Sequence, residues 1–400
     1  MRDFSSQVVI EALRSGISSR HLADLLTVGR EAAVERVGRA LQQLKDSGAS
    51  SAVLVKGNFG DGKTHFLNLI ANMAQREQMV VSYVALSKET PFDKPDKVYK
   101  KLAAATYLPD AAQPGFERLL EDIRPGSDLA TDLLDYAAAY LHPKIHAVLE
   151  NYFASVDPYH QHLLYGDLAG DFLAVAKLKS LHRLGFGRAL KMERFSKAHI
   201  FDYFRLLGYL FERRGYAGWV ILFDEYEQIA KLGPLGRARA YLHTARFLSA
   251  GQDTFPRTLA VFSATPNLVE DVIYGKDDLS LAPAKLEAKG MEAVHIAACR
   301  RALKFLLNET VFLGPLSSSD VRNLLQGVAE VHGRAYGWEP AVDPAAVMQS
   351  RGIMDRLRTQ IRAFVQYLDL KYLYGEEPLL SVTELAEPGT HEEEEDDDRE

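Results

Sequence analysis

Continuous apolar runs alternate along the chain with stretches in which apolar residues recur every three or four positions. The runs predict buried strands at 50–57, 79–87, 218–227, 258–267 and 309–317. Strands of a parallel sheet that are buried on both faces carry such uninterrupted runs. Because helical patterns separate the runs, the sequence predicts an α/β fold with a parallel sheet flanked by helices.

The helical patterns divide the chain into regions. An amphipathic stretch over 5–26 is interrupted at Gly16, and residues 64–78 carry apolar side chains at helical spacing. A long, mostly helical segment separates the second strand from the third, and helical spacing returns beyond the last strand. The expected regions are N-terminal helices at 1–49, a core at 50–315 with a helical insertion at about 100–200, C-terminal helices at 316–375 and a tail at 376–400.

Composition is ordinary for a globular protein, with 47% hydrophobic and 25% charged residues. No apolar run approaches the ~18–20 residues that a membrane-spanning helix needs, and the first residues lack the apolar core of a signal peptide. Cys299 is the single cysteine, so an intrachain disulfide is excluded, and we expect a buried packing residue rather than a nucleophile. A cytoplasmic location fits these features.

The formal net charge of −7 comes from the end of the sequence. The last nine residues, EEEEDDDRE, carry eight acids and one arginine, which gives −7, so the other 391 residues sum to zero. A run of like charges cannot bury itself, and we expect this tail to be disordered. It either keeps the protein in solution, or docks on a basic partner or competes with DNA for a basic surface.

A glycine-rich loop between the first strand and the next helix carries the first candidate chemistry. Gly57, Gly62, Lys63 and Thr64 match the pattern G-x-x-x-x-G-K-[ST], whose backbone N–H groups cradle phosphates at a helix N-terminus. Lys63 is expected to neutralise the β and γ phosphates, and the Thr64 hydroxyl to bind Mg²⁺. The loop therefore predicts an ATP site formed by Gly57, Asn58, Phe59, Gly60, Asp61, Gly62, Lys63, Thr64 and His65.

Acidic and polar residues follow the third and fourth strands. Asp224 and Glu225 come directly after the apolar run WVILF; Asp224 is expected to hold Mg²⁺, and Glu225 to act as general base toward the attacking water. Glu227 is expected at the surface or in an outer layer of the site. Candidates for positioning that water, unless they are turn residues, are Ser263, Thr265 and Asn267.

The segment TVGRE precedes the phosphate loop by about thirty residues. It resembles the adenine-side motif of AAA+ ATPases of the origin-recognition and STAND type. The resemblance implies that Val28 and Gly29 flank the adenine and that Arg30 lines the same pocket. The alternatives are a simple helix start and, for Arg30, a structural ion pair.

The C-terminal helices resemble an AAA+ lid. LGPLSSSDVRNLLQGVAEVHG has the polar turn and helix with which such a lid begins, and RLRTQIRAFVQYLDL resembles the helix that offers a sensor-2 arginine. The resemblance implies this role for Arg358, with Arg362 one turn later as the second choice. The alternative is that these arginines face solvent on an amphipathic helix.

A basic stretch precedes the third strand. Residues 177–197 carry seven lysines or arginines and one glutamate, interleaved with Phe186 and Phe195. Such a stretch either tracks a nucleic-acid backbone or is a solvated helix face that pairs with acids elsewhere. A DNA-binding role would rest on Lys177, Lys179, Arg183, Arg188, Lys191, Arg194 and Lys197.

As a whole, the chain resembles the BREX-type ATP-binding proteins (BrxD-like) of bacterial phage-defence islands. The segments SGISSRHLADLLTVGRE, VLVKGNFGDGKTHFL, VVSYVALS, RRGYAGWVILFDEYEQI and FSATPNLVEDVIYG occur in the order seen there, and the likeness spans about 5–370. It implies an AAA+-like ATPase that works as a homo-oligomer beside a helicase or another DNA-acting component. One departure is Lys285, at the place of a trans-acting arginine, for which Arg300 or Arg301 is the alternative.

The sequence therefore predicts a Mg²⁺-dependent ATP hydrolase of AAA+ type that acts on DNA or loads or regulates a partner helicase. Two alternatives stay open, a nucleotide-dependent signalling switch and a DNA-binding scaffold in which ATP is structural. The helical insertion lies within the 161 positions that separate Lys63 from Asp224. We expect it to bind a partner or substrate, because surface insertions tolerate added function.

Overall fold

The computed structural model describes residues 4–248, 255–308, 310–350 and 357–375, and the predicted acidic tail lies outside them. Packing divides the chain into two units. The terminal unit joins the residues up to Gly29 with those from Pro315 onward, and the sheet unit runs from Arg30 to Gly314. In the described part of the chain, no helix is long and apolar enough to cross a membrane.

The sheet unit is built on six strands in the order β3-β2-β4-β5-β1-β6. All neighbouring pairs are parallel except β2 and β3, which are antiparallel. The strands are β1 (Ser51–Gly57), β2 (Val80–Ala85), β3 (Thr106–Tyr107), β4 (Trp219–Asp224), β5 (Thr258–Ala264) and β6 (Thr310–Leu313). This confirms the predicted α/β class, a mostly parallel sheet flanked by helices. The sequence does not reveal β3, because two residues leave no apolar pattern.

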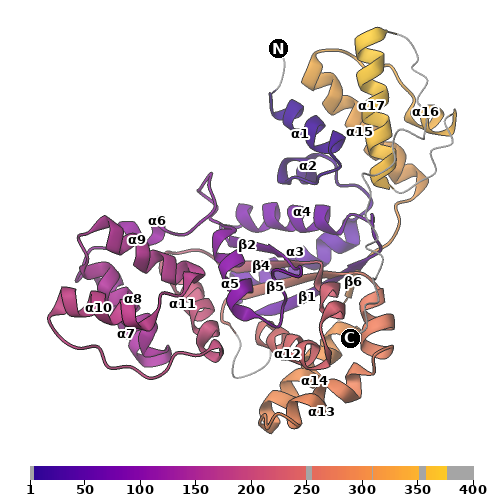
Figure 1. The fold of residues 1–400 in the computed structure, drawn as a ribbon. Coiled ribbons are helices and arrows are strands. Elements are labelled where there is room, and N and C mark those ends of the chain that lie inside the picture. Colours follow the sequence, from indigo (N-terminus) through magenta and orange to yellow (C-terminus); the bar gives the residue numbers. More distant parts are fainter. Residues whose placement is uncertain (1–3, 249–254, 309, 351–356, 376–400) are drawn as a thin grey trace, which may run out of the picture. The chain divides into compact units, whose positions relative to one another are not determined.

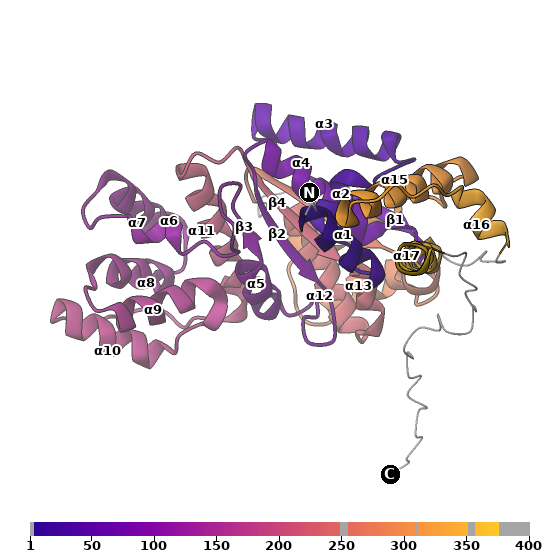
Figure 2. The same ribbon diagram turned by 90° about the horizontal axis from the view of Figure 1, so that it is seen from above.

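Helices cover the sheet, with α4 on one face and α12 on the other (Figures 1 and 2). Every residue of β4 and β5 is buried, which explains their uninterrupted apolar runs. The helices outside the insertion are α3 (Glu31–Ser47), α4 (Lys63–Arg76), α5 (Pro95–Ala104), α11 (Ile200–Arg213), α12 (Pro234–Thr244), α13 (Asp278–Glu287) and α14 (Ala293–Asn308).

The insertion folds as a lobe of helices on the β2–β3 side of the sheet (Figures 1 and 2). Its members are α6 (Arg118–Glu121), α7 (Asp128–Tyr140), α8 (Pro143–Ala154), α9 (Pro158–Gly166) and α10 (Val175–Phe186). Lys144 on α8 forms a fully buried ion pair with Asp167, at 2.5 Å. Tyr203 on α11 donates a hydrogen bond to the same carboxylate, also at 2.5 Å. This shared carboxylate links the lobe to a helix of the core.

The terminal unit contains α1 (Phe4–Arg14), α2 (Arg20–Leu25), α15 (Ser318–Tyr336), α16 (Pro344–Ser350) and α17 (Leu357–Tyr374). Side chains of α1, α15 and α17 form one apolar core, which includes Ile10, Val328 and Phe364. Residues 4–29 therefore pack with the C-terminal helices, whereas α3, from the same predicted N-terminal region, packs with the sheet. The division of the chain into regions at 1–49, 50–315, 316–375 and 376–400 stays a prediction.

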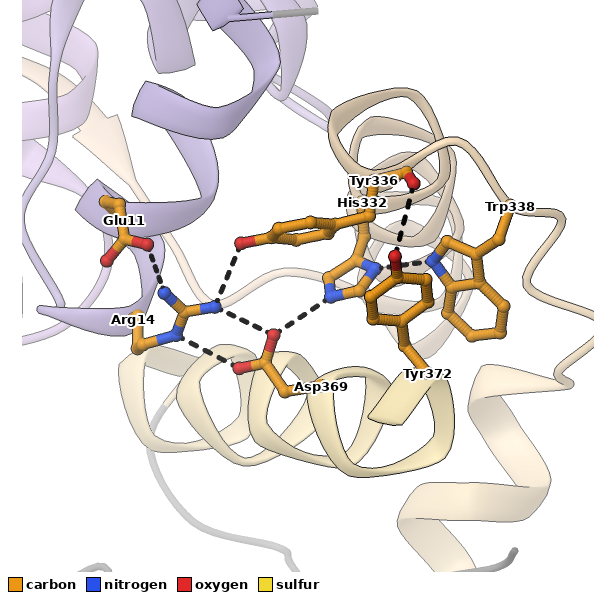
Figure 3. A network of polar contacts seen from close by, with 7 residues as sticks. All are labelled: Glu11, Arg14, His332, Tyr336, Trp338, Asp369 and Tyr372. Atoms are coloured by element: carbon orange, nitrogen blue, oxygen red, sulfur yellow. Dashed lines mark hydrogen bonds and ion pairs between the residues drawn. The ribbon is translucent and has the colours of Figure 1, made fainter. Parts of the chain in front are cut away.

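A polar network ties α1 to α15 and α17 within the terminal unit (Figure 3). Arg14 donates to both oxygens of Asp369, from Nε at 3.0 Å and from Nη2 at 2.7 Å. Trp338 Nε1 donates to His332 Nδ1 at 2.9 Å, so His332 Nε2 carries the proton and donates to Asp369 at 3.0 Å. Nη2 of Arg14 also donates to the Tyr336 hydroxyl at 3.3 Å. The carboxylate is thereby held between a cation and a neutral imidazole.

Candidate nucleotide site

The glycine-rich loop joins the end of β1 to the start of α4. Gly60 and Gly62 have φ values of 91° and 89°, which favour glycine. A Cβ atom on Gly57 would lie 3.0 Å from the Leu313 carbonyl oxygen, so this position needs a glycine for close packing. Within the loop, the Asn58 N–H donates to Asp61 Oδ2 at 2.6 Å. The loop is thus ordered by its own contacts and by its neighbour β6.

Lys63, the first residue of α4, directs its ammonium group into this loop. Its Nζ donates to the carbonyl oxygens of Gly57 at 2.9 Å and Asn58 at 3.1 Å. The Phe59 ring lies beside it, with its centroid 5.4 Å from Nζ. These contacts hold a positive charge among backbone groups at a helix N-terminus, the arrangement that binds phosphate.

Arg30 braces the loop through main-chain oxygens. Its Nη1 donates to the Gly314 carbonyl oxygen at 2.7 Å and its Nη2 to that of Asp61 at 2.8 Å. These contacts link the end of the β6 segment to the phosphate loop. Burial, together with the charge of Arg30, lowers the pKa of His65 to about 4, so this imidazole is neutral at pH 7.

The other two adenine-side candidates belong to the terminal unit. Val28 packs against the apolar core of that unit. Gly29 has a φ of 62°, and a Cβ atom there would lie 2.7 Å from a carboxylate oxygen of Asp320. Close approach to the start of α15 therefore explains the glycine of TVGRE.

Asp224, the last residue of β4, is the centre of a buried cluster of donors. Its side chain accepts hydrogen bonds at Oδ2 from the Thr64 and Tyr83 hydroxyls, both at 2.8 Å. Its Oδ1 accepts from the Ser263 hydroxyl and from the Glu225 N–H at 3.0 Å. Asp224 is 2% exposed. Among the described residues, no cationic side chain forms an ion pair with it. The carboxylate is held firmly while its charge stays uncompensated.

Tyr83 is a member of this cluster that sequence analysis missed. It lies on β2, which pairs with β4 so that Ala85 stands opposite Asp224. Burial, followed by the nearby Asp224 charge, raises the pKa of the Tyr83 hydroxyl, which therefore remains a donor. A tyrosine inside an apolar strand is usually a packing residue, so nothing in the sequence indicates that Tyr83 donates to Asp224. The pairing of β2 with β4 brings the two residues together.

The two acids after Asp224 lie in different surroundings. Glu225 is exposed, and its backbone is left-handed, with a φ of 56°. Gln228 Nε2 donates to its Oε2 at 3.2 Å. Glu227 is half-buried, with Oε2 buried and without a hydrogen-bond partner among the described residues. Burial raises the pKa of Glu227, against the opposing influence of Lys63.

The structure separates the polar candidates after β5. Ser263, inside the strand, contacts Asp224. Thr265 is buried and Asn267 is exposed, and neither donates to Asp224 among the contacts of the described residues. The geometry therefore assigns Ser263 to the support of Asp224.

The candidate arginines lie on several helices. Arg358 and Arg362 lie on α17 in the terminal unit, where a Cβ atom on Gly16 would meet both of their Cδ atoms at 3.3 Å. Lys285 on α13 and Arg300 on α14 are exposed. Arg301 is half-buried, and its Nη2 donates to the Ala245 carbonyl oxygen at 3.3 Å.

All seven cationic residues of the basic stretch are exposed. Arg188 pairs with Glu150 at 2.8 Å and Lys197 with Asp96 at 3.2 Å, while the other five form no ion pair among the described residues. Phe195 packs inside the lobe, with its ring centroid 4.7 Å from Lys144 Nζ. That ring therefore has a cationic neighbour within the lobe.

Comparisons with known proteins complete this description. A model of the family "BREX system ATP-binding protein BrxC/D" matches residues 2–123 and 189–373 and passes over the residues between, which hold most of the helical lobe. No curated protein matches the chain. Among solved structures, Cdc6p from Pyrobaculum aerophilum is 10% identical, with a TM-score of 0.39; the match covers 87% of this chain and 63% of that one. The chain thus spans less than two thirds of that protein.

Proposed function

The chain belongs to the BREX system ATP-binding protein BrxC/D family, as its resemblance predicted, and on that basis we propose that it hydrolyses ATP within this defence system. The cluster around Asp224 carries the proposal. A buried carboxylate held by hydroxyl donors, with no ion pair to a cationic side chain among the described residues, suits a metal ion that arrives with a nucleotide. The exposed Glu225 directly after it supplies a second carboxylate, which can act as general base.

The residues present fit both ATP and Mg²⁺. Magnesium is usually bound by one or two carboxylates together with phosphates and waters. In the described ranges, no group of three or more His, Cys, Asp or Glu residues is placed to hold a metal ion. Thr64 and Asp224 would hold Mg²⁺, which supplies neutralisation of the β and γ phosphates when bound.

Each residue then has a distinct task. Lys63 and the loop N–H groups bind the phosphates, and Ser263 and Tyr83 orient the Asp224 carboxylate. Glu225 accepts a proton from water as the water oxygen bonds to the γ phosphorus and the bond to the β-phosphate oxygen breaks, which yields ADP and phosphate. The predicted roles of Val28, Gly29, Thr265 and Arg358 toward the nucleotide belong to the same proposal.

We further propose that hydrolysis serves DNA or a co-encoded helicase, with the protein acting as a homo-oligomer. The exposed cations of the basic stretch that lack ion pairs support a polyanionic partner. ATP turnover that rises with DNA or a co-encoded protein would support this reading. Slow turnover that nothing stimulates would favour a nucleotide-dependent switch.

Replacing Glu225 tests the hydrolysis itself. We expect Glu225→Gln to lower ATP turnover by about 10²–10⁴-fold, because the general base is lost, while binding of a fluorescent ATP analogue is retained. Glu227→Gln is the matched control, since it neutralises an acid two positions away. Unchanged turnover in Glu225→Gln, or a larger loss in Glu227→Gln, would contradict the assignment of Glu225 as base.

A further inference from the structure

A pocket separate from the nucleotide site lies in the sheet unit, among the start of α5, the segment that leads into α11, helix α12, and the turn between α13 and α14. Its volume is about 380 Å³, within the range of small-ligand sites. None of its lining residues belongs to the phosphate loop or to the Asp224 cluster. Its apolar lining includes Pro95, Leu242, Leu286 and Met291.

One wall of the pocket is stiff. Arg237 on α12 makes two hydrogen bonds to Asp278 on α13, at 2.7 and 2.8 Å, and this ion pair is almost fully buried. Tyr241 donates to the same carboxylate at 2.7 Å. Because these residues fasten α12 to α13, the side chains that α12 contributes to the pocket, Arg239 among them, stand on a fixed support.

Cationic side chains surround this apolar space. Lys94, Lys197, Arg239, Arg246 and Lys289 all line it. Lys94 pairs with Asp93 at 3.3 Å and Lys197 with Asp96 at 3.2 Å. Arg239 and Lys289 are exposed and form no ion pair among the described residues. Two uncompensated positive charges at one pocket attract an anion.

Polar groups inside the pocket lack partners. Asp93 is 9% exposed, and its Oδ1 is buried without a hydrogen-bond partner among the described residues. Nδ1 of His295 is in the same condition. Leaving a buried polar atom without a partner is unfavourable, so a ligand with a complementary donor would stabilise Asp93 Oδ1. The exocyclic amino group of a nucleobase is such a donor.

A planar cation completes the chemistry. The Arg246 guanidinium lies over the Phe201 ring, 4.4 Å from its centroid, and both residues line the pocket. Unstacked bases stack on guanidinium planes as well as on aromatic rings. The pocket thus combines an apolar space, a stacking plane, orphan polar atoms and free cations, which are the features of a nucleotide rather than of a phosphate alone.

We infer that this pocket holds one nucleotide unit of single-stranded DNA. The base enters the apolar space, an amino group of the base donates to Asp93 Oδ1, and the adjoining phosphates face Arg239 and Lys289. A base paired within a duplex cannot enter without leaving its stack. An acidic peptide fits less well, because its carboxylates would face Asp93.

This inference rests on the proposed action on DNA and names where the strand would be held, but it does not require ATP hydrolysis. Binding of a fluorescent single-stranded oligonucleotide to the full chain tests it. We expect Arg239→Ala/Lys289→Ala to weaken binding about 10-fold and to reduce the slope of log K against log salt by about 1.4, for two lost phosphate contacts.

The matched control is Arg39→Ala/Lys304→Ala, which removes two exposed cations outside the pocket and should leave affinity nearly unchanged. ATP turnover without DNA should stay at the wild-type level in the pocket variant. Because turnover is measured separately, a failure of this inference is distinguishable from a failure of the hydrolase proposal.

Probe identity distinguishes the possible ligands. We expect a strand with abasic sites to bind about 10-fold more weakly than the intact strand, since base stacking is lost, and a duplex to bind more weakly still. Four results would overturn the inference: equal binding of the abasic strand, equal affinity of the pocket variant, displacement by a free deoxynucleoside monophosphate as effective as by the strand, and displacement by polyglutamate as effective as by DNA. The last would indicate an acidic protein partner.

Discussion

Asp224 in the sheet unit and Asp369 in the terminal unit are both tethered by several donors, but they differ in electrical balance. Asp224 accepts from hydroxyls and a backbone N–H, all of them neutral. Asp369 accepts from the Arg14 guanidinium and from neutral His332. The charge of Asp369 is therefore balanced by Arg14, whereas the donors to Asp224 bring no positive charge.

The difference indicates which cluster serves structure and which is prepared for a ligand. Removing a charge from water is unfavourable unless a partner compensates it. Arg14 provides that compensation for Asp369, and the network joins three helices of the terminal unit (Figure 3). Asp224 has no such partner among the described residues, so its burial is explained by the proposed metal ion rather than by stability.

Among the variants that test this comparison, Asp224→Asn is expected to have the largest effect. Charge stabilisation by a metal is worth several kcal/mol, so losing its carboxylate ligand should lower ATP turnover by about 10²–10³-fold. The free energy of unfolding should stay the same or rise, because an uncompensated buried charge is removed. Turnover assays and denaturant titration measure the two quantities. A clear loss of stability in this variant would mean that Asp224 is a structural residue and would break the comparison.

Asp369→Asn should behave in the opposite way. Hydrogen bonds to charged groups contribute about 1.5–3 kcal/mol, so we expect the terminal unit to lose about 2 kcal/mol of unfolding free energy. The chain has two tryptophans, and in a Trp219→Phe background the fluorescence of Trp338 reports on this unit alone. Glu330→Gln removes an exposed acid from α15 of the same unit and serves as control, with an expected change below about 0.5 kcal/mol.

The smallest effect is expected from acid. Burial is the largest influence on Asp369 and raises its pKa, but the hydrogen bonds from His332 and Arg14 together outweigh it, so the pKa lies below the ordinary 3.8. The stability linked to this group is therefore present above the unfolded pKa and is lost as pH falls through the lower folded value. Unfolding of the terminal unit is again followed by Trp338 fluorescence. Between about pH 5 and pH 3, the unfolding free energy should fall more in the protein that retains Asp369 than in Asp369→Asn. Parallel losses would show that Asp369 does not titrate with folding.

Much of the nucleotide site could be predicted because it lies in short, continuous motifs. The apolar runs place β1, β4 and β5, and parallel strands bring their carboxyl ends to one edge, where Thr64 and Ser263 both contact Asp224. Tyr83 could not be predicted, since it contacts Asp224 across the β2–β4 pairing. The hydrogen bonds from Arg30 to the main-chain oxygens of Gly314 and Asp61 could not be predicted either, because a carbonyl partner leaves no residue type to recognise.

Local patterns along the chain were sufficient to establish the α/β class, the phosphate loop and the acidic pair at the end of β4, because each depends on residues close together in sequence. Contacts between distant segments could be established only in three dimensions. Asp224 lies at the end of a strand and Asp369 lies on a helix. Neither sequence segment reveals whether a cationic side chain pairs with its aspartate. Arg14 and Asp369 are 355 positions apart in the sequence. Whether a carboxylate is neutralised by an arginine or stays available to a metal ion therefore depends on which distant side chains the fold brings within hydrogen-bonding distance.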